Sequence, residues 1–153
     1  MAYTTIDDPA KHFTCFLWTG DGNSPRSLTG VGFQPDMMWS KIREVGHEHS
    51  LIDSVRGVDN KRLKPDSQAA EDTTNTHGHF DSLDSDGFTV TGASGYYNVN
   101  RNTEPYVGWF WKGGGGSGSA DSNGTINTTS TSANTTALFS VSTYTGNNSN
   151  SQT

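Results

Sequence analysis

The stretch GFQPDMMWSKIREVGHEHSLIDSVR, residues 32–56, decides the fold class of this 153-residue chain. It contains two apolar runs, with a turn predicted between them at residues 44–46. In the first run, Met37 and Trp39 fall on one face of a strand, and Met38 falls on the opposite face. Apolar side chains on both faces predict a strand covered on both sides, as in the interior of a β-sandwich.

The segment YVGWFW, residues 106–111, shows the same double-sided pattern. Trp109 and Trp111 share one face of the predicted strand. Tyr106 and Phe110 share the other face. Shorter apolar or alternating runs predict further strands at 13–18, 27–31, 51–56 and 88–91, with a hairpin turn at 85–87 whose Asp-Gly pair supplies a positive φ.

Helical periodicity is weak throughout the sequence. Residues 68–71 can form one helical turn, but no run of ten residues repeats every 3.6 positions. The hydrophobic content of 30% is low, yet four Trp, five Tyr and seven Phe provide large side chains for a core. We therefore predict an all-β fold, an antiparallel β-sandwich with at most one or two short helical turns.

The charge and the cysteine content of the chain exclude several classes of function. The net charge is −6 and no basic stripe is present, so nucleic-acid binding is not expected. Cys15 is the only cysteine, which excludes an intrachain disulfide and a thiolate metal cage. Its place in the apolar run 13–17 predicts a buried, unreactive thiol. No signal peptide or membrane span is readable at the N-terminus, so membrane insertion is not expected.

Composition divides the chain into four segments. We expect residues 1–12 to form an N-terminal arm and residues 13–112 to form the β-sandwich domain. Residues 113–137, rich in Gly, Ser, Thr and Asn, are predicted as a flexible linker or a polar strand. Residues 138–153 are either a closing strand or the start of a second repeat. FSVSTYTG at 139–146 is similar to the first strand at an offset of 126 residues (139 minus 13), which favours a fragment of a longer repeat protein.

Several phrases of the sequence resemble one family in the same order. The chain is similar to a domain repeated in tail-fibre and other virion proteins of marine bacteriophages, itself similar to concanavalin-like and laminin-G-like jelly-roll sandwiches. The phrases are YTTIDDP at 3–9, WTGDGNS at 18–24, GFQPDMMWSK at 32–41, LIDSVRG at 51–57, SQAAED at 67–72, DSDGFTV at 84–90 and YVGWFWKGGG at 106–115.

The resemblance implies a bacteriophage virion structural protein, made in the host cytoplasm and placed in a tail fibre, tail or capsid appendage. Its expected partners are further copies of itself and other virion proteins. The alternative is a lectin-like receptor-binding module that recognises host surface polysaccharide. A depolymerase fragment is the third hypothesis, but no catalytic motif is present and we do not expect an enzyme.

One candidate metal site lies in the predicted hairpin turn. Asp81, Asp84 and Asp86 are closely spaced carboxylates, which suit calcium. An EF-hand loop is excluded, because its first ligand would be Ser82 and its twelfth would be Ala93. The alternative is an ordinary hairpin turn with no cation.

Two His-x-His pairs are a second candidate for metal binding. His47 and His49 form one pair, and His77 and His79 form the other. On a strand, residues two apart point to the same side, so each pair can offer two imidazoles to one ion. In a trimeric fibre, three such pairs around an axis can form an octahedral site. The alternative is that they are exposed polar loop residues.

Tyr96 and Tyr97 are the candidate glycan-binding residues. They lie in a predicted loop, and exposed aromatic rings are a common platform for sugar rings. The alternative is that both rings cover one end of the sandwich.

Overall fold

Nine strands and one short 3-10 helix make up the computed structural model, which describes residues 6–59, 61–74, 76–92 and 99–148. In chain order the elements are η1 Pro9–Lys11, β1 Phe13–Thr19, β2 Arg26–Thr29, β3 Met37–Ile42, β4 Ser50–Asp53, β5 His79–Asp84, β6 Gly87–Thr91, β7 Pro105–Trp111, β8 Thr128–Asn134 and β9 Phe139–Tyr144.

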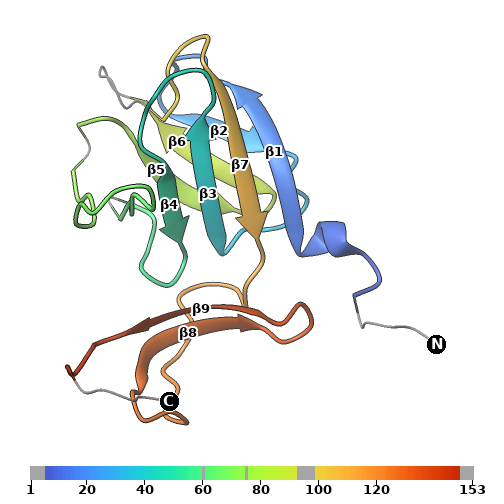
Figure 1. Ribbon diagram of the computed structural model, residues 1–153. Coiled ribbons are helices and arrows are strands. Elements are labelled where there is room, and N and C mark those ends of the chain that lie inside the picture. Colours follow the sequence, from blue (N-terminus) through green and yellow to red (C-terminus); the bar gives the residue numbers. More distant parts are fainter. Residues whose placement is uncertain (1–5, 60, 75, 93–98, 149–153) are drawn as a thin grey trace.

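Two antiparallel sheets face one another and form the sandwich (Figure 1). The first has the strand order β1-β7-β3-β4, and the second has the order β2-β6-β5. A third sheet is the hairpin β8–β9, which lies below the sandwich in Figure 1. The predicted all-β sandwich is confirmed. The helical turn predicted at residues 68–71 is wrong, because this segment returns in extended form and pairs Arg62 with Asp72 by backbone hydrogen bonds.

The core lies between the two sheets and is largely aromatic. Phe88 on β6 is fully buried, and its ring centroid lies 5.3 Å from that of Phe110 on β7 and 5.2 Å from that of Trp18 on β1. Trp18 in turn stacks on Tyr106 at 5.1 Å. Met38 on β3 lies opposite Phe110 in the sheet and is also fully buried. Phe88 was predicted to point inward, and Tyr106 and Phe110 share one face of β7 as the alternation predicted.

The outward side of the first sheet differs from the prediction. We expected β3 and β7 to be covered on both faces, but Met37, Trp39, Trp109 and Trp111 are only half-buried. Trp39 packs on Trp109 and on His49 of the loop before β4, and Trp111 packs on Phe13 and on Phe139 of β9. The ring centroids of Trp39 and Trp109, for example, are 6.1 Å apart. Alternation therefore identified the two faces correctly, but it did not reveal that only one is closed.

Strand β1 forms one edge of the first sheet, which explains a second wrong prediction. Cys15 is exposed rather than buried. It points outward together with Phe13 and Leu17, which are 42% and 60% exposed. Within the apolar run 13–17, Phe16 packs against the core, and Trp18, the next residue, belongs to the core itself.

The hairpin β5–β6 turns at Ser85 and Asp86 as predicted, but for a different reason. Gly87 does not have a positive φ and is already the first residue of β6. A Cβ atom on Gly87 would lie 1.9 Å from the carbonyl oxygen of Leu28 on β2. Glycine is needed there because strand β2 approaches its backbone closely.

The start of the glycine-rich segment after β7 is held to the sandwich by Asp36, and a flexible linker beyond it stays a prediction. The Asp36 carboxylate is buried and accepts hydrogen bonds from the backbone N–H of Gly113 at 2.7 Å and of Gly115 at 3.2 Å. It also accepts one from the Ser54 hydroxyl at 2.7 Å. A single carboxylate therefore connects the start of β3 with the segment that leads into β8.

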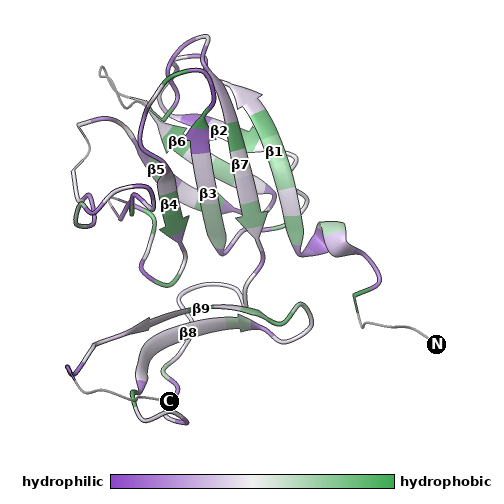
Figure 2. Cartoon of the chain, in the orientation of Figure 1, coloured by the Kyte–Doolittle hydropathy of each residue, from purple (hydrophilic) through white to green (hydrophobic). Residues whose placement is uncertain are grey.

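The polar hairpin β8–β9 follows this segment. Its first strand, Thr128–Asn134, lies within the Thr-, Ser- and Asn-rich region for which a polar strand was one of the two alternatives. Figure 2 shows intermediate hydropathy along most of the hairpin and a hydrophobic stretch near its turn. Strand β9 pairs with β8, whereas the similar segment β1 pairs with β7. The two segments thus occupy different places, and a second repeat stays a prediction.

Candidate functional site

The most distinctive surface is the outward side of the first sheet, which we call the outer face. Register places its side chains in rows across the strands. One row runs from Cys15 through Trp109 and Trp39 to Leu51, because each is directly opposite the next. By register the outer face comprises Phe13, Cys15, Leu17, Thr19, Met37, Trp39, Lys41, Leu51, Asp53, Pro105, Val107, Trp109 and Trp111. Most of these side chains are apolar, and those of Phe13, Cys15 and Leu17 on β1 are exposed to solvent.

An open groove of about 420 Å3 lies where the outer face meets the hairpin β8–β9. We call it the aromatic groove, because Trp111 forms its floor between Phe13, at 5.1 Å, and Phe139, at 6.1 Å between ring centroids. Its size and apolar lining suit a sugar ring or a large side chain. The lining residues are Ile6, Pro9, His12, Phe13, Trp111, Ala137, Leu138 and Phe139.

Leu138 stands at the rim of this groove in an unusual conformation. It is 90% exposed and has a φ of 55°, in the left-handed region that leucine rarely adopts. The Asn134 side chain stabilises the turn by accepting hydrogen bonds from the backbone N–H of Thr136 and Ala137. Its amide also donates to the Nδ1 atom of His12 at 2.9 Å. The hairpin turn is therefore fixed in place with an apolar side chain projecting from it.

Sequence reasoning missed this groove as a site. Phe13, Trp111 and Phe139 were interpreted as strand residues, and nothing local in the sequence shows that 139 approaches 111. One signal was available, because the predicted strand at 13–18 carries large apolar residues on both sides and cannot bury both in a two-layer domain.

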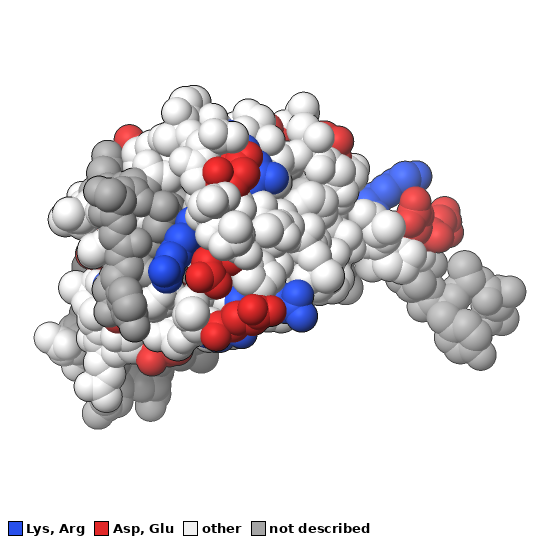
Figure 3. Space-filling model, turned by 90° about the horizontal axis from the view of Figure 1, so that it is seen from above, with Lys and Arg blue, Asp and Glu red and all other residues white. Residues whose placement is uncertain are grey.

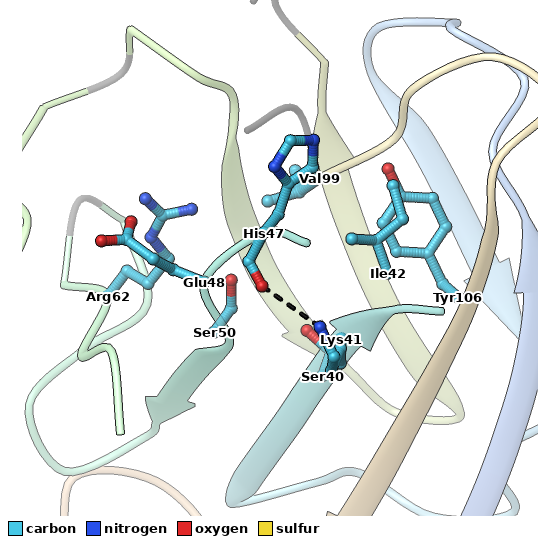
Figure 4. Close-up of a pocket in the computed structure, with 9 residues that line it drawn as sticks. All are labelled: Ser40, Lys41, Ile42, His47, Glu48, Ser50, Arg62, Val99 and Tyr106. Atoms are coloured by element: carbon cyan, nitrogen blue, oxygen red, sulfur yellow. Dashed lines mark hydrogen bonds between the residues drawn. The ribbon is translucent and has the colours of Figure 1, made fainter. Parts of the chain in front are cut away.

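A second cavity lies at the end of β3 and contains His47 (Figure 4). The cavity volume is about 20 Å3, enough for one or two ordered waters. Figure 4 shows the His47 ring beside Val99, with Tyr106 and Ile42 on the neighbouring strands. Lys41 donates a hydrogen bond from Nζ to the His47 carbonyl oxygen at 3.2 Å. The cavity is too small for a substrate and is part of the fold.

Burial dominates the proton affinities around this cavity. Burial lowers the pKa of His47 below its ordinary value, and the nearby positive charge of Arg101 lowers it further. Burial also raises the pKa of Tyr106 to about 12. The Tyr106 hydroxyl oxygen accepts a hydrogen bond from the backbone N–H of Arg101 at 2.9 Å. Both side chains are therefore uncharged at neutral pH.

The predicted pair His47 and His49 does not share one side of a strand. Both residues lie in the loop before β4, and His49 lies beside the outer face. Its Nδ1 atom accepts a hydrogen bond from the Trp39 indole N–H at 3.0 Å, and its Nε2 atom lies 3.9 Å from Asp66. This arrangement orients Trp39 on the outer face.

The second pair is placed differently. His77 lies in the turn before β5, and His79 is the first residue of that strand. The Nε2 atom of His79 is 2.8 Å from the Asp81 carboxylate and 3.7 Å from that of Asp59. Within residues 6–59, 61–74, 76–92 and 99–148, no group of three His, Cys, Asp or Glu side chains is arranged to hold a metal ion.

Asp81, Asp84 and Asp86, the three carboxylates predicted to bind calcium, accept hydrogen bonds from different donors. Asp81 accepts from the Thr91 hydroxyl, and Asp84 accepts from the Ser82 and Thr89 hydroxyls. Asp86 reaches across to the β2–β3 connection, where it accepts from the backbone N–H of Gly30 and Gly32. They stabilise the hairpin and its neighbour, and calcium binding stays a prediction. The glycan candidates Tyr96 and Tyr97 lie outside the described residues.

Charged side chains of both signs lie next to one another on the face viewed from above in Figure 3. Arg26 pairs with Asp21 at 3.2 Å, and Arg101 lies 3.8 Å from Glu104. No helix of the described chain is long and apolar enough to cross a membrane.

A family model described as Domain of unknown function (DUF7483) matches residues 8–153, which include the sandwich, the glycine-rich segment and the hairpin β8–β9. No curated protein and no solved structure matched the chain.

Proposed function

Because the chain belongs to the family described as Domain of unknown function (DUF7483), we propose a function for the domain as a whole: a β-sandwich assembly module of a bacteriophage virion protein. In this proposal the module forms part of a tail fibre, tail or capsid appendage and contacts further copies of itself and other virion proteins. The resemblance of several phrases of the sequence to marine phage virion proteins supports the phage setting and the finer jelly-roll assignment.

The outer face is the observation that carries the assembly role. Monomeric proteins rarely leave a contiguous apolar sheet face in water, and larger apolar patches mark interaction sites. Here the half-buried Trp39, Trp109 and Trp111 adjoin the exposed Phe13 and Leu17. Aromatic residues are enriched at the centres of protein interfaces, so the outer face is suited to binding another protein.

The test is the location and oligomeric state of the protein. Particles purified from the phage that carries this gene are expected to contain the chain, detected by mass spectrometry and placed by antibody labelling in the electron microscope. The isolated full chain is expected to self-associate in sedimentation experiments. If the chain is absent from phage particles that are otherwise complete, the virion assignment is contradicted. If the isolated chain is a monomer at every concentration in sedimentation, the assembly role is contradicted.

The aromatic groove favours the alternative, a lectin-like module that binds host surface glycans. Sugar rings stack on exposed aromatic side chains, and Trp111 offers such a surface between Phe13 and Phe139. A glycan array tests it: Trp111→Ala should abolish binding, whereas Trp39→Ala, outside the groove, should not. Adding a chelator tests the calcium prediction at the same time. No binding by the wild-type chain to any host polysaccharide removes this alternative.

Neither proposal includes a catalytic step. Incubation of the protein with host polysaccharide should therefore produce no new reducing ends. Their appearance would favour the depolymerase hypothesis instead.

A further inference from the structure

The free edge of β1 has the backbone geometry of a strand that lacks a neighbour. Among the residues that the structure describes, β1 pairs only with β7 and is the first strand of the sheet order. The hydrogen bonds from Lys112 N–H to the His12 carbonyl at 2.9 Å and from Gly20 N–H to the Glu104 carbonyl at 2.8 Å fix the phase of this ladder. In antiparallel strands bonded positions alternate, so the N–H and C=O groups of residues 13, 15 and 17 point away from β7.

From Phe13 to Leu17, and within the described part of the chain, this edge has none of the usual protection against pairing. Natural sheets protect their edges with charged side chains, prolines, bulges or very short strands. β1 is seven residues long, FTCFLWT, and contains neither a charged residue nor a proline. Its register with β7 is continuous from Phe13 to Thr19, without a bulge. Figure 1 shows β1 along the outer margin of the sheet, and Figure 2 shows its hydrophobic stretch.

We propose that β1 pairs antiparallel with β1 of a second copy of this chain, about a two-fold axis at Cys15. The inference rests on the proposed assembly role and names its partner and register. In this register Phe13 of one copy lies opposite Leu17 of the other, and the two Cys15 residues face each other. Each of the pairs 13–17, 15–15 and 17–13 exchanges two backbone hydrogen bonds. Two four-stranded sheets become one continuous sheet.

Two observations select this register. First, it places the exposed Phe13 beside the exposed Leu17, the two large apolar side chains at this edge. Second, this register leaves the backbone N–H and C=O of Thr19 unpaired with the second copy. The Thr19 carbonyl oxygen already accepts a hydrogen bond from Arg26 Nη1 at 2.7 Å. A register shifted by two residues would pair Phe13 with Thr19 and would have to compete with Arg26.

The pairing also explains the position of the outer face. Cys15 and Trp109 belong to one row across the sheet. Joining two sheets at β1 joins this row to its symmetry mate, so the aromatic outer faces form one surface across both copies. A two-fold axis makes such an interface self-complementary and closed, which gives a dimer and not a filament.

Cys15 provides a direct test of the register in the full chain. Directly opposite residues in a hydrogen-bonded pair have Cα atoms about 5.5 Å apart, within the range that a disulfide spans. Mild oxidation with copper phenanthroline is therefore expected to give a covalent dimer on a non-reducing gel. Leu17→Lys keeps the thiol but adds a charge to the edge, and we expect the rate of cross-linking to fall at least about tenfold.

Thr29→Lys is the matched control, because it adds the same charge at an exposed position on β2, an edge strand of the other sheet. Its cross-linking rate should equal that of the wild type. Cys15→Ser should still sediment as a dimer, and Leu17→Lys should dissociate it. Circular dichroism melting of each variant confirms that it is folded.

The outcomes separate the inference from the proposed function. If the wild-type chain forms oligomers that Leu17→Lys leaves intact, the β1 pairing is overturned while the assembly role stands. If the chain is monomeric and Cys15 cross-links no faster than a free thiol, both are overturned. Cross-linking of Cys15 only to a different protein overturns the pairing between copies.

Discussion

Replacing Asp36 by alanine removes the carboxylate that joins the sandwich to the glycine-rich segment. The carboxylate accepts three hydrogen bonds, and two of them, from Ser54 and from the buried Gly113 N–H, are 2.7 Å long. The third donor, Gly115, is exposed and can bond to water once Asp36 is absent. Hydrogen bonds to a charged group contribute about 1.5–2 kcal/mol each at the lower end, so losing two reduces the free energy of unfolding by about 3–4 kcal/mol.

Asp36→Asn is the matched variant with the same shape. Its amide oxygen can still accept from Gly113, and its NH2 group can donate to the Ser54 oxygen. The Ser54 hydroxyl then donates to the Gly116 carbonyl, which already lies 2.9 Å away. Only the charge is lost, and we expect a cost of about 1 kcal/mol.

Urea denaturation followed by tryptophan fluorescence measures both values, and a loss of 3–4 kcal/mol is a large share of the roughly 5–15 kcal/mol that stabilises a typical domain. Hydrogen exchange locates the effect, since the amide of Gly113 should exchange faster in Asp36→Ala while that of Phe88 changes little. If alanine costs less than about 1 kcal/mol, or if asparagine costs as much as alanine, Asp36 does not hold the two parts together as argued.

Three further predictions concern the core, a glycine and a histidine. Phe88→Ala should lower the free energy of unfolding by about 3–5 kcal/mol, because Phe88 is fully buried between the sheets; calorimetry showing a smaller change than for an exposed residue would contradict this. Gly87→Ala should destabilise by about 1–3 kcal/mol through contact with the Leu28 carbonyl, whereas Gly46→Ala meets no atom within 4 Å and should be neutral or slightly stabilising; equal urea midpoints would refute the difference. Burial holds the pKa of His47 below its ordinary value, so the unfolded chain binds the proton first as the pH falls. The free energy of unfolding should decrease below about pH 6.5, and His47→Gln should reduce that slope; an unchanged slope would show that His47 is not responsible.

The period of two in the sequence predicted most of the strands of the sandwich and which residues share a face. Phe110 and Tyr106 on β7 and Phe88 on β6 lie where alternation placed them. Alternation describes one strand at a time, so it cannot show whether a second layer of structure covers a given face of the sheet. For this reason Trp39 and Trp109 were expected to be covered on both sides, and Cys15 was expected to be buried.

The candidate surfaces depend on contacts between distant parts of the chain. Asp36 accepts from Gly113, 77 residues later, and Trp111 meets Phe139 only because the glycine-rich segment returns the hairpin to the sheet. No local pattern encodes such contacts. The His-x-His spacing suggested a metal ligand pair only if the residues lay on a strand, but His47 and His49 lie in a loop, where spacing does not fix direction.

The central position of β7 also determines when the sandwich can be completed during synthesis. Residues 13–19 and 37–42 are made early, yet they never touch as neighbours, since β7 lies between them. A nascent chain that has not yet released residues 105–111 from the ribosome therefore holds two separate strands with no shared partner. The larger sheet can therefore close only after residues 105–111 have been translated, and until then the side chains of β1 and β3 lack their neighbours on β7.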